Sequence, residues 1–191
     1  MSLKKYLNNA WQEITELKKN LNNAWQDCEF GRIFKDNTWV DVWTKGLKAT
    51  KTVVDTNSGQ NHTHSISDDR KSLTFKVTGT GVAQVSQLVF GISKSNGFGT
   101  RIKIKYTLKQ TVSITQGASL GFMNGSFGRL SSSSGVFWQR SSISNEKTYE
   151  GTVTLSSNQT TLYLNIDANY NYSIEGTIKN IYINDELVTF E

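Results

Sequence analysis

Two short segments combine aromatic rings with polar side chains that form several hydrogen bonds at once. Their members are Trp138 and Arg140 in the first segment, and Asp167, Asn169, Tyr170 and Tyr172 in the second. A flat ring covers the apolar face of a pyranose, and carboxylate, amide and guanidinium groups bond pairs of hydroxyls. These residues therefore predict saccharide-binding chemistry.

Each segment leaves a plainer interpretation open. In Val136-Phe137-Trp138-Gln139-Arg140, Trp138 and Arg140 share one face of a strand if Phe137 points into the core. The opposite arrangement would bury Trp138 and expose Phe137. In the second segment, the tyrosines would either contact a ligand or pack over the end of the domain.

Metal, cofactor and catalytic chemistry are not expected. His62 and His64 share one strand face, but no third ligand follows at close spacing. Asp68 and Asp69 resemble a charged turn more than a calcium site. The sequence lacks a nucleophile elbow and a phosphate-binding glycine loop, and no pocket pattern supports Asp167 and Glu150 as a glycosidase pair. We therefore expect a non-enzymatic protein without a cofactor.

Alternation of apolar and polar residues indicates that the elements carrying these segments are strands. Four runs show it clearly: Leu73 to Val77, Leu88 to Ile92, Ile102 to Leu108 and Leu162 to Ala168. Clusters rich in Gly, Ser and Asn separate such runs. Eight or more strands with one wet face each predict an all-β head, a jelly-roll-type β-sandwich.

The N-terminal segment contains a repeat. Leu3 to Gln12 returns almost unchanged at Leu17 to Gln26, an offset of two heptads. A coiled coil would place at its a and d positions the residues Leu3, Leu7, Ala10, Ile14, Leu17, Leu21, Ala24 and Cys28. Trp11 and Trp25 widen the apolar stripe, which favours three or more helices over two. We predict an α-helical stalk over 1–30 that forms a homotrimer, and a head over 31–191. A single amphipathic helix lying on the head is the alternative.

Charge and cysteine content narrow the class of protein. The formal net charge is +5, and the only tight basic row is Arg101, Lys103 and Lys105, so nucleic-acid binding is not expected. One cysteine excludes an intrachain disulfide framework. No apolar run approaches a membrane span and no signal-peptide core begins the chain, so we expect synthesis in the cytoplasm without membrane insertion.

The strand pattern also carries a resemblance. Arg101 to Leu108, Tyr149 to Leu155, Leu162 to Ile166 and Ile178 to Ile183 resemble the second half of carbohydrate-binding jelly-roll modules. A short stalk with a sandwich head is similar to the trimeric receptor-binding proteins of phages that infect Gram-positive bacteria. The resemblance implies a virion tail or baseplate protein that binds host cell-wall saccharide and contacts other tail proteins. A structural assembly protein and a secreted carbohydrate-binding module are the alternatives.

Overall fold

In the part of the chain that the computed structural model describes, all regular secondary structure is β-strand. Backbone and side chains are described for 46–52, 61–81, 85–114, 117–130 and 135–191, and the backbone alone for the strands before Gly46. The chain divides into two compact units, Met1–Gly46 and Leu47–Glu191. No helix in the described residues has the length and apolar character to cross a membrane.

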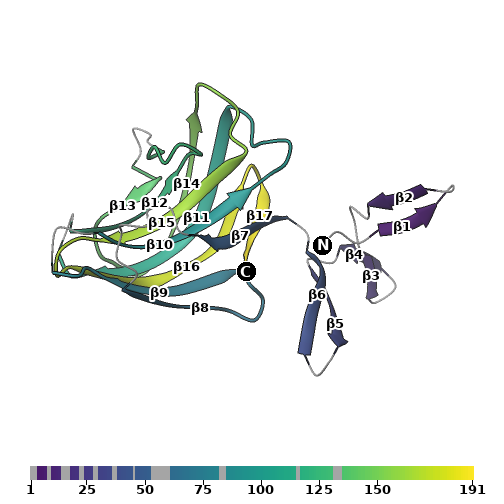
Figure 1. Ribbon diagram of the computed structural model, residues 1–191, viewed down its shortest axis with the longest axis horizontal. Coiled ribbons are helices and arrows are strands. Elements are labelled where there is room, and N and C mark those ends of the chain that lie inside the picture. Colours follow the sequence, from purple (N-terminus) through teal and green to yellow (C-terminus); the bar gives the residue numbers. More distant parts are fainter. Residues whose placement is uncertain are drawn as a thin grey trace. The chain divides into compact units, whose positions relative to one another are not determined.

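The unit Leu47–Glu191 is a sandwich of two strand layers (Figure 1). The first layer has, from edge to edge, β13 (Trp138–Gln139), β12 (Ala118–Met123), β15 (Thr161–Ala168), β10 (Ser86–Ser93) and β7 (Leu47–Thr52). The second layer has β8 (His62–Ile66), β9 (Ser72–Thr78), β16 (Ser173–Ile183), β11 (Arg101–Val112) and β14 (Ile143–Thr154). Neighbouring strands within each layer pair antiparallel.

The last strand, β17 (Glu186–Phe190), connects the two layers. It forms a hairpin with β16 through the pair Ile183 and Glu186, and it then runs parallel to β7. Asn184 and Asp185 both have positive φ at the hairpin turn, as the tight turns that suit twisted strands require. Because β17 pairs on both sides, the layers are joined by backbone hydrogen bonds at this edge.

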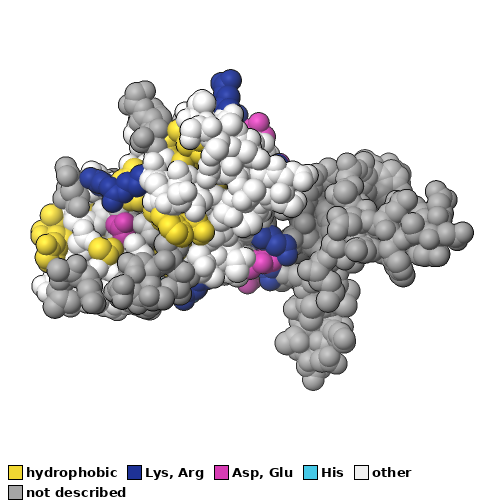
Figure 2. Space-filling model, turned by 45° about the horizontal axis from the view of Figure 1, so that its top comes forward, with side chains coloured by type: hydrophobic (Ala, Val, Ile, Leu, Met, Phe, Trp, Pro, Cys, Tyr) yellow, Lys and Arg dark blue, Asp and Glu magenta, His cyan; other side chains and the backbone are white. Residues whose placement is uncertain are grey.

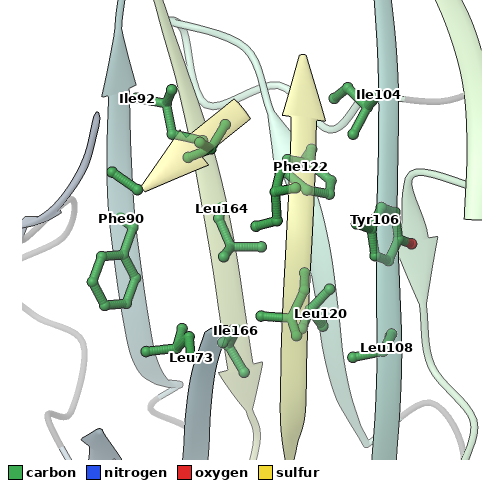
Figure 3. Packing of buried hydrophobic residues seen from close by; sticks show 14 of the residues in the cluster. Leu73, Phe90, Ile92, Ile104, Tyr106, Leu108, Leu120, Phe122, Leu164 and Ile166 are labelled. Carbon is green, nitrogen blue, oxygen red and sulfur yellow. The ribbon is translucent and has the colours of Figure 1, made fainter. Parts of the chain in front are cut away.

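The core lies between the layers and contains side chains from both (Figure 3). Tyr106 of β11 and Phe122 of β12 meet with ring centroids 5.4 Å apart, and Phe90 of β10 meets Phe190 of β17 at 5.3 Å. The inward residues of the four alternating runs are buried, which confirms the predicted strand faces there. The prediction of an all-β sandwich is likewise confirmed for this unit.

The N-terminal unit contains three antiparallel pairs of strands. They are β1 (Lys4–Leu7) with β2 (Ala10–Glu13), β3 (Lys18–Leu21) with β4 (Ala24–Asp27), and β5 (Phe30–Lys35) with β6 (Thr38–Thr44). The structure therefore does not confirm a helical stalk. Side chains of residues 1–45 lie outside the described part, so the predicted oligomerisation residues remain untested: Leu3, Leu7, Ala10, Ile14, Leu17, Leu21, Ala24 and Cys28.

Strand β8 places two histidines beside the core at the edge of the sandwich. The ring centroid of His64 is 5.9 Å from that of Phe90 in the other layer, and 5.8 Å from that of His62. The pKa of both imidazoles is lowered below the ordinary value of 6.5. Partial burial is the larger cause, and the positive charge of the nearby Lys51 is the next. Each histidine therefore binds a proton less readily in the folded chain than in the unfolded chain.

This pKa difference predicts loss of stability in mild acid. Above pH 6.5 both histidines are neutral in either state; as the pH falls through 6.5 and then through the lowered pKa values, the unfolded chain takes up more protons and is favoured. The double variant H62Q/H64Q should have a flatter dependence of Tm on pH between about 7 and 5. Calorimetry over this range tests it, and an identical slope in the double variant would contradict it.

Candidate functional site

A hydrogen-bonded carboxylate lies on the outer face of the first layer. Asp167 and Asn165 alternate with the buried Leu164, Ile166 and Ala168 of β15, so they point away from the core. Ser119 of β12 is directly opposite Asp167. Its Oγ donates to Asp167 Oδ1 at 2.6 Å, and Asn165 Nδ2 donates to Asp167 Oδ2 at 2.9 Å. The two bonds fix the carboxylate plane.

The segment around Trp138 is attached to both layers. Phe137 is buried in the core, so the arrangement that puts Trp138 on the opposite side is the one observed. The Tyr106 hydroxyl donates to the Val136 carbonyl at 2.5 Å, and the Phe122 amide donates to the Phe137 carbonyl at 3.0 Å. Trp138 is thereby held by its neighbours in the chain against the edge of the first layer.

Trp138 lies directly against Gly121, its partner across the strand pair. A Cβ atom added to Gly121 would be 1.9 Å from Trp138 Cε3, so only glycine leaves room for the indole. The guanidinium carbon of Arg129 is 4.3 Å from the centroid of the indole, a cation–π contact. Arg129 thus covers one ring face, and a sugar cannot stack on that face while Arg129 stays there.

Two arginines supply positive charge to Asp167. Burial raises the pKa of Asp167 above 3.8, whereas the bonds from Ser119 and Asn165 and the charges of Arg129 and Arg140 lower it, and burial dominates. Arg129 is exposed and Arg140 is partly exposed. The cluster therefore contains a carboxylate that is costly to keep charged, together with two guanidinium groups that reach solvent.

A groove of about 950 Å³ opens beside this cluster. Arg129, Trp138 and Arg140 line one part of it, and Ile143, Lys147 and Tyr149 of β14 line another. The described surface mixes hydrophobic, basic and acidic side chains over short distances (Figure 2). The groove thus combines aromatic surface with hydrogen-bond donors.

Two buried polar atoms in this region have no hydrogen-bond partner within the described part of the chain. They are Asn165 Oδ1, an acceptor on a side chain that is 1% exposed, and Trp138 Nε1, a donor. Leaving such atoms unpaired costs about 1 to 3 kcal/mol each. Native structures rarely retain such atoms. Because both atoms are buried, a ligand could bond them only after the covering side chains move aside.

The other predicted residues lie in the turn between β15 and β16. The ring centroids of Tyr170 and Tyr172 are 6.1 Å apart; Tyr170 is 55% exposed, and Tyr172 packs on Gly117, where an added Cβ would be 2.3 Å from the ring. The Asn169 amide donates to the Gly117 carbonyl at 3.0 Å. Tyr172 thus packs over the end of the sandwich, whereas Tyr170 is free to touch a ligand.

The sequence indicates Trp138 and Arg140 in one segment and Asp167 in another; the structure brings the charges of Arg129 and Arg140 close to Asp167, and the sequence analysis missed Arg129, Asn165 and Ser119. Arg129 follows a glycine-rich turn with no strand alternation, so nothing in its local pattern indicates its neighbours. The alternation predicts a wet face for Asn165, yet Asn165 is 1% exposed. Its partners across the strand pairs are Val89 of β10 and Gly121 of β12, and the indole of Trp138 lies against Gly121. The position of Asn165 two residues before Asp167 on one strand face was the available signal.

The other acidic and histidine residues that the sequence analysis considered do not pair with Asp167 or form a metal site within the described part of the chain. Glu150 lies on β14 of the second layer, where its carboxylate pairs with the Lys103 ammonium of β11 at 3.1 Å, so it does not face Asp167. Asp69 accepts bonds from Ser67 Oγ and the Lys71 amide, which makes it a turn residue. No group of three or more metal-ligating side chains occurs within the described residues.

Comparison with known proteins gives partial likenesses in structure only. No family model and no curated protein match this chain. Among solved structures, the enzymatically active domain of bacteriophage CBA120 tailspike protein 4 aligns at 14% identity with a TM-score of 0.36, covering 72% of this chain and 19% of that chain. This chain thus spans about a fifth of the tailspike chain.

Two carbohydrate-binding modules align over most of their own length. A xylan-binding domain from Paenibacillus barcinonensis aligns at 11% identity with a TM-score of 0.38, covering 75% of this chain and 86% of that chain. The C-terminal CBM6 of a marine laminarinase from Zobellia galactanivorans aligns at 9% identity with a TM-score of 0.34, covering 64% and 87%. Likenesses of this size carry no argument about what the chain binds.

The geometry around Asp167 predicts opposite effects for two substitutions. In D167N the uncharged amide still accepts from Ser119 and can donate to Asn165 Oδ1 after the Asn165 amide turns over, so stability at pH 7 should equal or exceed that of the wild type. In D167A two donors lose their acceptor, which should cost about 1 to 3 kcal/mol. Urea unfolding at pH 7 measures both. A D167N protein as unstable as D167A would show that the buried charge stabilises the fold.

Proposed function

We propose that the sandwich unit binds saccharide on the outer face of the first layer, at the cluster of Asp167, Asn165, Trp138, Arg129 and Arg140. One observation carries this proposal: Asp167 is held in a fixed orientation, although burial makes its charge unfavourable, beside an acceptor and a donor that have no partner. A fold gains nothing by keeping such a group, whereas a binding site does.

The chemistry of the cluster matches the needs of a sugar. Each hydroxyl both donates and accepts, so a site requires fixed acceptors and donors side by side. Asp167 supplies acceptor oxygens, and Arg129 and Arg140 supply donors that reach solvent. Asn165 Oδ1 and Trp138 Nε1 are buried, so they can add an acceptor and a donor only when the side chains that cover them move aside. Tyr149 lines the adjoining groove; its ring stacks on Tyr106 at 5.3 Å and the Lys147 ammonium lies 5.1 Å from its centroid, so a pyranose can reach a face of this ring only when Lys147 moves aside.

We propose binding without hydrolysis. Glycosidases use two carboxylates across the scissile bond, roughly 5 to 9.5 Å apart. Among the described residues, the charged side chains that act on Asp167 are Arg129 and Arg140. Glu150, the other acid that the sequence offered, belongs to the second layer and is paired there with Lys103.

Substitution of Arg140 tests the site directly. R140Q removes a charged donor beside Asp167 and should weaken binding at least about tenfold, or about 1.4 kcal/mol. The measurement is binding of labelled full-length protein to Gram-positive cells, with and without their extracted cell-wall polysaccharide as competitor.

R101Q is the matched control, because Arg101 is an exposed arginine at the start of β11 in the second layer. It should bind as the wild type does. Equal binding by R140Q and the wild type would remove Arg140 from the site, and no competition by polysaccharide with any strain would refute saccharide recognition.

We further propose that the full chain is a phage receptor-binding protein made in the cytoplasm, assembled into the virion, and acting outside the host cell. The 14-residue repeat over 3–26 supports association of copies, since it repeats the same apolar residues. Three copies would present three shallow sites to a repetitive surface, and linked binding can raise avidity a hundredfold or more.

The trimer predicts the mass of the full-length protein in solution. It should be three times the 21.4 kDa of one chain, because each of the three copies would contribute its repeat to the shared interface. Light scattering after gel filtration measures it, and L21D, which places a charge in the repeat, should lower the mass. A wild-type mass of 21.4 kDa would refute the trimer. Circular dichroism of the full chain would separately distinguish a helical stalk from strands.

A further inference from the structure

A second aromatic surface lies on the same outer face as Asp167, outside the cluster described above. Phe127, in the loop after β12, is 46% exposed, and its ring centroid is 4.8 Å from that of Tyr163 on β15. Tyr163 points outward in the same alternation that turns Asn165 and Asp167 outward. An exposed phenylalanine in contact with a partly exposed tyrosine forms an apolar platform on this sheet face.

The backbone holds Phe127 in an unfavourable conformation. Its φ is 60°, in the left-handed region that bulky residues rarely adopt. Asn124 maintains the turn: its carbonyl accepts from the Phe127 amide at 2.9 Å, and its Oδ1 accepts from the Ser126 and Gly128 amides at 3.0 and 2.8 Å. A glycine or asparagine would fit this position without strain. Strain of this kind, on an exposed ring, points to a use outside folding.

A shallow groove of about 510 Å³ lies along Tyr163. Its floor contains Gly91, the partner of Tyr163 across the strand pair, where an added Cβ would be 3.5 Å from the tyrosine ring. Hydroxyl side chains surround the ring: Thr50, Thr52, Ser93 and Thr161. Lys48 at the rim is paired with Glu191. Lys51 also lines the groove. An aromatic ring among hydroxyl and ammonium groups suits a sugar unit.

Tyr163 and Asp167 are four residues apart on one straight strand, or about 13 Å at 3.3 Å per residue. We infer that the outer face of β15 is an extended site for the internal units of a glycan chain, in which Phe127 and Tyr163 contact one sugar next to the units held at Asp167. This inference rests on the proposed saccharide function and names its ligand class: a chain of several units, bound along its length.

Chain length is the variable that tests the extended site. Cell-wall polysaccharide from a Gram-positive strain that the protein binds is partly hydrolysed and separated by size, and calorimetry measures the affinity for each fraction. Affinity of the wild type should rise at least tenfold from the shortest fragments to the long ones. In F127G and Y163A the affinity for long fragments should fall to that for short ones.

Controls separate this inference from the proposed function. F127G should remain folded, because glycine adopts this φ readily, and F127W should restore binding of long fragments. I114A is the matched control for F127G, because Ile114 is also a large exposed apolar residue, 52% exposed, in the turn after β11. Wild-type affinity that is independent of length, or full binding by F127G and Y163A, would overturn the extended site alone. No binding of any fragment by the wild type would refute the saccharide function and the extended site together.

Discussion

Burial of one face of β15 is the constraint on which the rest of the sandwich unit depends. Leu162, Leu164 and Ile166 are fully buried between the layers, and β10 and β12 pair with β15 on either side. A shift of one residue in this pairing would send these side chains to solvent and bring Asp167 into the core. The hydrophobic energy of the inward residues therefore also fixes where the outward residues lie.

Because the outward positions are fixed in this way, the folded chain contains Asp167 although this group does not stabilise it. Asp167 opposes folding at neutral pH to the extent that burial raises its pKa, and the bonds from Ser119 and Asn165 reduce that cost without removing it. Both donors lie on strands whose other faces are packed in the core. The hydrophobic packing of these core-facing sides thus offsets the unfavourable free energy of the site, and the site keeps its geometry without a ligand.

Periodicity accounts for what the sequence could predict and for what it could not. The two-residue alternation of β9, β10, β11 and β15 follows from burial of one face, so those strands and their inward residues were predictable. The N-terminal repeat is different, because an offset of two heptads also suits strand pairs such as β1–β2 and β3–β4, in which Leu7 is opposite Ala10 and Leu21 opposite Ala24. Arg129 was unpredictable, since its place beside Trp138 depends on how a loop folds back.

The shape of the outer face depends on where the strands carry glycine, which has no side chain. Gly121 makes room for Trp138, whereas a Cβ on Gly91 would lie at an ordinary contact distance of 3.5 Å from the ring of Tyr163. Glycine weakens a strand, so its presence in the middle of β10 and β12 calls for a reason beyond pairing. In β12 the reason is steric, because the indole of Trp138 can lie on the strand only while Gly121 has no Cβ. Glycine at an outward position of a strand, opposite an aromatic or amide residue, therefore indicates a hollow on a sheet face, and this signal is readable once the strand register is known.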